Sequence, residues 1–162
     1  MIHTHTVGCD ECGNIFPIPD KKGEGVTVYN ASGGALSEGQ VVLIGYDEAT
    51  GQEVTVDTPA TSAFPVRTAL VMENGIADEE IGKVQISGVG KARVLDSSAL
   101  VVGRALEVLN GATVLSDDGG AVRTTTTAAF LQEAVTEDED SEETYVLKDV
   151  VLVPEQHTIA AS

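Results

Sequence analysis

Two histidines and two cysteines with the chemistry of metal ligands stand at the start of the chain: His3, His5, Cys9 and Cys12. Imidazole nitrogens and thiolates bind zinc, and four such ligands close a tetrahedral shell with no position open for water. The spacing of Cys9 and Cys12 is that of a zinc knuckle, and Gly13 follows where the chain must turn. The residues therefore predict a structural Cys₂His₂ zinc site, in which metal binding folds a segment that has no core of its own.

Other interpretations of the same residues stay open. A single CxxC is also the spacing of a redox pair or of two inert thiols. An HxH this close to a chain start is also compatible with a disordered terminus. Structural zinc at these four positions is therefore a hypothesis, and we expect no other cofactor. If the site exists, it is a clasp and not an active site.

The remaining catalytic patterns are incomplete. Residues 88–92, GVGKA, lack the first glycine of a phosphate-binding loop, because Gln85 stands there, and Ala92 replaces the magnesium-binding hydroxyl. His157 would need the tail and the arm of the chain to meet before it could serve a triad. A glycosidase pair of carboxylates would lack sugar-stacking aromatics, since aromatic residues make up 4% of the chain and there is no tryptophan. We predict that the protein is not an enzyme.

The elements that must position these residues have the pattern of short β-strands. Valine, threonine and isoleucine alternate with polar residues and are cut at close intervals by glycine, asparagine and aspartate. The expected strands are Val26 to Tyr29, Gln40 to Ile44, Glu53 to Val56, Val66 to Met72, Lys83 to Ser87, Ala92 to Leu95, Arg104 to Leu109, Thr113 to Leu115, Ala121 to Thr126 and Tyr145 to Val153. They predict an all-β fold, a compact glycine-rich barrel or sandwich over residues 26–154. Residues 128–135 fit a strand or two helical turns, and we favour a strand.

One local pattern recurs along the chain. An apolar residue precedes a glycine and then a strand at residues 36–44, 79–86 and 100–108. The spacing is too irregular for a solenoid. The pattern indicates one turn-to-strand device that is used again within the domain.

Three segments lie outside the strand pattern. Residues 1–25 lack sustained alternation and contain Pro17 and Pro19, which favours an extended N-terminal arm. Residues 137–143 carry six acidic side chains in seven positions, which predicts a solvated loop; a calcium loop would need alternating ligands and a central glycine. Residues 155–162 form a C-terminal tail of small and polar residues.

The charge balance excludes two classes of partner. The formal net charge is −17 at pH 7, which repels phosphate backbones and anionic lipids, so we expect neither nucleic acid nor membrane as a partner. The sequence also bears on where the protein is made. No apolar stretch has the length of a membrane span, and the first residues lack the pattern of a secretory signal. Two cysteines three residues apart do not make a disulfide scaffold. We expect synthesis in a reducing cytoplasm.

The turn residues carry a resemblance to a known family. A pattern N-x-S/T-G-x-x-L/I-x-x-G-x-x-V is matched, with one extra glycine at Gly34, by Asn30, Ser32, Gly33, Leu36, Gly39 and Val42. A second pattern, I-A-x-x-x-x-G-x-V-x-x-x-G-x-V, is matched by Ile76, Ala77, Gly82, Val84, Gly88 and, with a shift, Val94. Residues 128–154 look like the closing strand pair, here with an acidic loop between the strands. The chain resembles the tailed-bacteriophage capsid decoration (cement) proteins, and the arm lies outside the pattern.

This resemblance implies a function. Such a protein is a non-enzymatic β protein that binds the major capsid protein on the outer surface of the virion head, as a homotrimer at local three-fold positions, and stabilises the shell. It would be synthesised in the cytoplasm of the host bacterium, and residues 1–25 would mediate subunit or shell contacts. A phage tail or fibre-associated β module is the alternative, and a metal-dependent hydrolase is a less favoured one.

Overall fold

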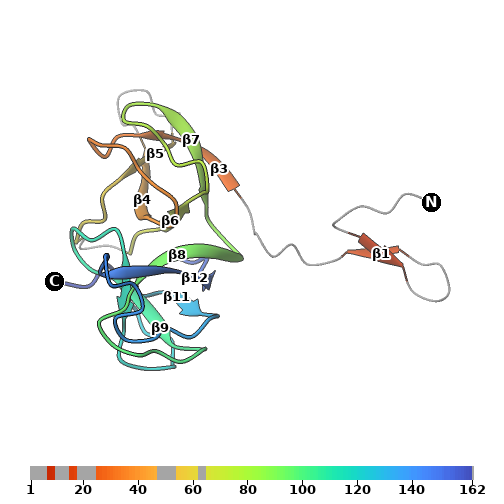
Figure 1. Cartoon of the computed structure of the whole chain (residues 1–162). Coiled ribbons are helices and arrows are strands. Elements are labelled where there is room, and N and C mark those ends of the chain that lie inside the picture. Colours follow the sequence, from red (N-terminus) through yellow and green to blue (C-terminus); the bar gives the residue numbers. More distant parts are fainter. Residues whose placement is uncertain (1–6, 10–14, 18–24, 47–53, 62–64, 162) are drawn as a thin grey trace.

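The structure is a computed structural model, which describes residues 7–9, 15–17, 25–46, 54–61 and 65–161. Every regular element in these ranges is a β-strand, as the sequence predicts (Figure 1). The strands are β1 Val7–Cys9, β2 Ile15–Pro17, β3 Gly25–Asn30, β4 Val41–Tyr46, β5 Val54–Asp57, β6 Thr68–Val71, β7 Ile81–Gln85, β8 Val89–Leu95, β9 Ala105–Val108, β10 Leu115–Asp117, β11 Thr127–Leu131 and β12 Tyr145–Leu152. Within the described ranges, no helix is long and apolar enough to cross a bilayer.

The strands close into two barrels. In the first, here called the N-barrel, the strand order is β3-β5-β4-β6-β7, and in the second, the C-barrel, it is β10-β8-β12-β11-β9. Figure 1 shows the N-barrel in orange to yellow-green and the C-barrel in green to blue. Strands β1 and β2 form a separate antiparallel pair, in which Val7 lies opposite Pro17. The predicted barrel architecture is confirmed, and the structure builds it twice.

The two barrels have the same topology. The first strand of each barrel pairs in parallel with the third strand and antiparallel with the fifth: β3 with β5 and β7, β8 with β10 and β12. The second strand of each pairs antiparallel with the third and fourth strands. Strands β3 to β7 therefore correspond in order to strands β8 to β12, so the fold is an internal duplication.

Each barrel has its own core of alternating inward side chains, as a half-buried strand requires. In the N-barrel the core residues are Val28, Leu36, Val42, Val56, Ala69, Val71, Ile76 and Val84. The C-barrel cluster holds Ala92, Val94, Leu100, Leu106, Val108, Leu115, Ala128, Ala129, Leu131, Val135, Val150, Leu152 and Ile159. Val41 and Leu70 belong to N-barrel strands but pack into this second cluster, so the barrels share an apolar contact.

Equivalent turns link the first and second strands of the two barrels. Leu36 forms a β-bridge with Ile76, and Leu100 forms the corresponding bridge with Val135. These bridges belong to the turns at residues 36–40 and 100–104. The recurring sequence pattern at residues 36–44 and 100–108 marks this pair of turns. Its third occurrence, at residues 79–86, marks a different turn, the one that enters β7.

One predicted strand is absent and another is displaced. The strand expected at Thr113 to Leu115 is β10, which begins only at Leu115. Residues 121–126 form bends and irregular backbone, because their threonine hydroxyls bond locally and take the place of ladder partners. Thr124 and Thr127 both donate to Asp118 Oδ2, at 2.9 and 2.6 Å. The strand favoured within residues 128–135 is confirmed as β11, which ends at Leu131.

The division into an arm, a β domain and a tail, with limits at residues 25 and 154, stays a prediction. The β domain over residues 26–154 contains both barrels, and the hairpin of β1 and β2 falls within the predicted arm. Two residues of the predicted tail are tied to the barrels: His157 bridges to Val66, and Ala160 bridges to Leu109.

Candidate functional site

The predicted metal ligands fall at the edge of the described chain. His3, His5 and Cys12 lie outside the described residues, and Cys9 ends β1, where its backbone pairs with Ile15. The zinc site therefore stays a prediction. Elsewhere, in the ranges that the structure describes, no three histidine, cysteine, aspartate or glutamate side chains are grouped so that they could hold a metal.

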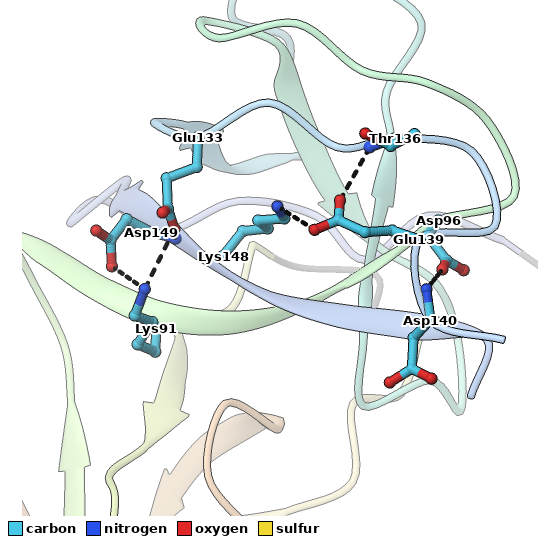
Figure 2. Close-up of polar contacts among 8 residues, drawn as sticks. All are labelled: Lys91, Asp96, Glu133, Thr136, Glu139, Asp140, Lys148 and Asp149. Atoms are coloured by element: carbon cyan, nitrogen blue, oxygen red, sulfur yellow. Dashed lines mark hydrogen bonds and ion pairs between the residues drawn. The ribbon is translucent and has the colours of Figure 1, made fainter. Parts of the chain in front are cut away.

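The acidic segment 137–143 is the exposed loop that the sequence predicts. Its conformation is set by Asp96, which follows β8 and is only 3% exposed. The backbone N–H of Asp138 donates to the Asp96 carbonyl at 2.9 Å. Figure 2 shows the second bond, in which the N–H of Asp140 donates to Asp96 Oδ2 at 3.0 Å. Asp140 in turn accepts from the N–H of Glu142 at 2.9 Å. These carboxylates hold backbone groups, which is a structural use of them.

A cluster of opposite charges lies on β8, β12 and the segment after β11 (Figure 2). Lys91 Nζ contacts Asp149 Oδ1 at 3.0 Å and Glu133 Oε2 at 3.2 Å. The hydrogen bond that Lys91 donates to Asp149 is the main reason that the pKa of Lys91 is raised. The backbone N–H of Asp149 donates to Glu133 Oε2 at 2.6 Å, and this bond lowers the pKa of Glu133. Lys91 is thus held as a cation, the form in which an amine is neither base nor nucleophile.

A second ion pair secures the acidic loop. Lys148 Nζ donates to Glu139 Oε1 at 2.6 Å, and Glu139 also accepts from the N–H of Thr136 at 2.9 Å (Figure 2). The bond from Lys148 is the main cause of the lowered pKa of Glu139. Partly exposed pairs of this kind contribute little net stability, about 0–1 kcal/mol. Their effect is to fix the loop against β12.

A hollow of about 290 Å³ lies beside this charge cluster, between the barrels. Its lining is mainly apolar and comes from both sides, with Leu70, Val71 and Met72 from the N-barrel and Val89 and Gly90 from the C-barrel. Lys91 and Asp149 border it, and they neutralise each other. The hollow therefore has mainly apolar walls, and its charged border also includes Glu38 and Glu73.

His157 is held in a buried pair with Thr68. The Thr68 hydroxyl lies 2.8 Å from His157 Nε2, and His157 Nδ1 lies 3.3 Å from the Thr158 carbonyl. A hydroxyl on an imidazole is the start of a nucleophile and base arrangement. Here the third group is a backbone carbonyl, and the side chains of Thr68 and His157 are both buried. Burial lowers the pKa of His157, and the pair ties the C-terminal segment to β6.

Asn30 holds the turns of the N-barrel together and is fully buried. Its amide nitrogen donates to the carbonyls of Gly34 at 2.8 Å and Ala77 at 3.1 Å. Its side-chain oxygen accepts from the hydroxyl of Ser32 at 2.6 Å. The corresponding residue after β8 is Asp96, since Asn30 N–H donates to the Glu80 carbonyl and Asp96 N–H to that of Thr144. The sequence analysis did not identify Asp96. A signal was present, because residues 94–96, VLD, repeat the pattern of residues 28–30, VYN, in which two largely apolar residues precede a polar one.

Comparison with known proteins gives a similarity of structure and none of sequence. No protein-family model matches the chain, and no curated protein matches it. A solved structure described as the crystal structure of head fiber gp8.5 N base in bacteriophage phi29 is similar to it with a TM-score of 0.49 and 9% sequence identity. That similarity covers 82% of this chain and 98% of the other.

Proposed function

We propose that this chain is a non-enzymatic decoration (cement) protein of a tailed-bacteriophage head. It binds the major capsid protein on the outer surface of the virion as a homotrimer at local three-fold positions, and it stabilises the shell. It is synthesised in the cytoplasm of the host bacterium. Its net charge of −17 disfavours nucleic acid and membrane surfaces as partners.

The observation that supports a structural role most directly is the use made of the buried polar side chains. Asn30 and Asp96 fix turns, and Thr68 and His157 join the C-terminal segment to the N-barrel. Among the described residues, no buried side-chain nitrogen or oxygen lacks a hydrogen-bond partner. Enzyme sites hold polar groups ready for a substrate, whereas these groups are engaged in holding the fold.

The residues of the resemblance support the choice of family. Asn30 and Ser32 bond to each other, Leu36 and Ile76 exchange two backbone hydrogen bonds of 2.8 Å, and Gly39 forms the turn into β4. These positions build the N-barrel and its contact with the C-barrel. They are the ones that a family with this architecture would keep, so the pattern and the fold agree.

The arm is part of the same proposal. Residues 1–25 reach a neighbouring subunit or the shell, with structural zinc at His3, His5, Cys9 and Cys12 as a clasp. The ligand types and the CxxC spacing support this assignment. Native mass spectrometry with and without a chelator tests it: one zinc per chain is expected, and a metal-free chain would contradict it. A chain that starts at Val26 and binds heads as tightly as the full chain would exclude a contact role for the arm.

Binding to separated phage particles tests the function. The purified protein is mixed separately with undecorated heads and with tails, and each mixture is sedimented. Both kinds of particle come from the phage in whose lysate the chain occurs. We expect saturable binding to heads, in a ratio of three chains to each local three-fold position, and none to tails. Binding to tails alone would favour the tail or fibre-associated alternative. Binding to neither would contradict a virion role.

A further inference from the structure

The two equivalent turns of the barrels differ in what covers them. The turn at residues 36–40, here called the docked turn, lies against the C-barrel: the Gly39 carbonyl accepts from Arg93 N–H at 2.9 Å and the Glu38 carbonyl accepts from Arg93 Nε at 3.1 Å. Gly39 is buried, and a Cβ on it would strike the side chain of Leu147. At the turn of residues 100–104, here called the free turn, a Cβ on Gly103 would meet nothing within 4 Å among the residues that the structure describes.

Their backbone conformations are nevertheless the same. Gly39 and Gly103 have φ of 78° and 89°. Gly39 N–H donates to Val71 at 2.9 Å, and Gly103 N–H donates to Leu131, the corresponding residue, at 2.7 Å. The free turn therefore already has the shape that docks in the other barrel.

The free turn is also more apolar than the docked one. Ser37 and Glu38 of the docked turn correspond to Val101 and Val102, which are 70% and 59% exposed. Beside the docked turn, Leu70 is fully buried in the C-barrel cluster, whereas its counterpart Phe130 is only partly buried. Two adjacent exposed valines and a partly exposed phenylalanine form an apolar surface on a highly charged chain.

The surface that receives the docked turn also has an uncovered counterpart. Arg93 on β8 pairs with Leu147 on β12, and the same register position in the N-barrel is Thr27 on β3 paired with Lys83 on β7. Thr27 and Lys83 are exposed, and Ile81, two residues before Lys83 on β7, is 69% exposed. This β3–β7 face offers an apolar side chain for the valines and an ammonium group that can donate to a turn carbonyl, as Arg93 does for Glu38.

We propose that the free turn of one chain docks on the β3–β7 face of a second copy, in the way that the docked turn meets the C-barrel within one chain. We propose the head-to-tail form, in which each pair of copies makes this contact once, and the chains close into a ring if the rotation allows. In such a ring the N-barrel of each chain docks on its own C-barrel, and that C-barrel docks on the N-barrel of the next chain. The inference rests on the self-association proposed above and names the surfaces that produce it.

Exposed lysine substitutions on each surface test this contact. V101K/V102K changes the free turn, and T27K/I81K changes the β3–β7 face. Y46K is the control, because Tyr46 at the end of β4 is 73% exposed and belongs to neither surface. All three add positive charge to an acidic chain, so general repulsion between copies does not increase. Circular dichroism and urea unfolding show whether each variant keeps its fold, which their exposure predicts.

Light scattering after size-exclusion chromatography then gives the number of chains. We expect wild type and Y46K to share a multi-chain mass, and both surface variants to associate at least tenfold more weakly. An equal mixture of the two surface variants should yield a two-chain species, because each such pair retains one intact contact. This outcome requires that the contact joins the free turn of one copy to the β3–β7 face of the other.

Three results would overturn the inference. Folded surface variants of wild-type mass would place self-association elsewhere. If V101K/V102K loses association and T27K/I81K keeps it, the free turn docks on another surface. This result is expected if the arm of the same chain covers the β3–β7 face. A wild type that stays a single chain would remove the contact altogether. Head binding is measured separately by co-sedimentation, so the proposed attachment to the head is tested independently of the proposed self-association.

Discussion

Alanine at the two equivalent glycines tests the internal duplication and its asymmetry. Gly39 and Gly103 both have positive φ, a region that costs an alanine about 1–2 kcal/mol. The effect of alanine on the unfolded chain is the same at both positions, so it cancels in the comparison. The difference between the two variants therefore measures what surrounds each turn in the folded protein.

The surroundings predict a larger loss at Gly39. A Cβ there would collide with Leu147 and lie 3.1 Å from Arg93 N and 3.3 Å from the carbonyl carbon of Ala92. Because two of these neighbours are backbone atoms of β8, the barrels must shift, and such overpacking costs about 1–3 kcal/mol more. We expect a loss of about 2–5 kcal/mol for Gly39→Ala and about 1–2 kcal/mol for Gly103→Ala.

Urea unfolding followed by circular dichroism measures both variants under one set of conditions, at a protein concentration low enough to keep single chains. At this concentration the free turn is uncovered, so Gly103→Ala shows the backbone cost alone. Equal losses would refute the assignment of one docked and one free turn. A larger loss at Gly103 would mean that this turn is the covered one.

Three further outcomes follow from the site geometry. Asn30→Ala should lower the free energy of unfolding by about 2–4 kcal/mol, because it leaves buried carbonyls unpaired; a loss below that of an exposed-site control in urea unfolding would contradict this role. The lowered pKa of buried His157 means that the unfolded chain binds the proton more readily, so stability should fall as the pH drops below about 6.5 and His157→Gln should flatten that dependence. An unchanged pH profile in thermal unfolding of that variant would refute the burial of the imidazole. Lys91→Met should change stability by less than about 1 kcal/mol, because its ion pairs are partly exposed, and a larger loss in urea unfolding would count against this.

The sequence predicts the strands well because alternation is a local signal. Val26 and Val28 pack inward at period two on β3, and Val84 packs against them from β7. The failure at residues 121–126 has a physical reason, since Thr124 has the β propensity of a strand residue but its hydroxyl satisfies Asp118. Propensity does not report which hydrogen bond a threonine makes.

The duplication was harder to predict. Residues 36–44 and 100–108 carry the same turn pattern, yet the second barrel lacks the counterparts of Gly33 and Gly34, so the repeats do not align at a fixed period. Asp96 replaces Asn30 as the residue that fixes the turn, and a carboxylate in a strongly acidic chain is not conspicuous. Gly39 is covered by residues that are distant in sequence, Ala92, Arg93 and Leu147. The residues next to Gly39 in the sequence therefore do not predict that its turn is the covered one.

Release of DNA from heated heads tests the central claim most directly. Heads with and without the bound protein are warmed in steps in the presence of a fluorescent dye that cannot enter an intact shell. A cement protein predicts a higher temperature of DNA release for decorated heads, rising with occupancy until the sites are filled. The same release temperature at full occupancy would contradict the account, because the protein would then bind the shell without stabilising it.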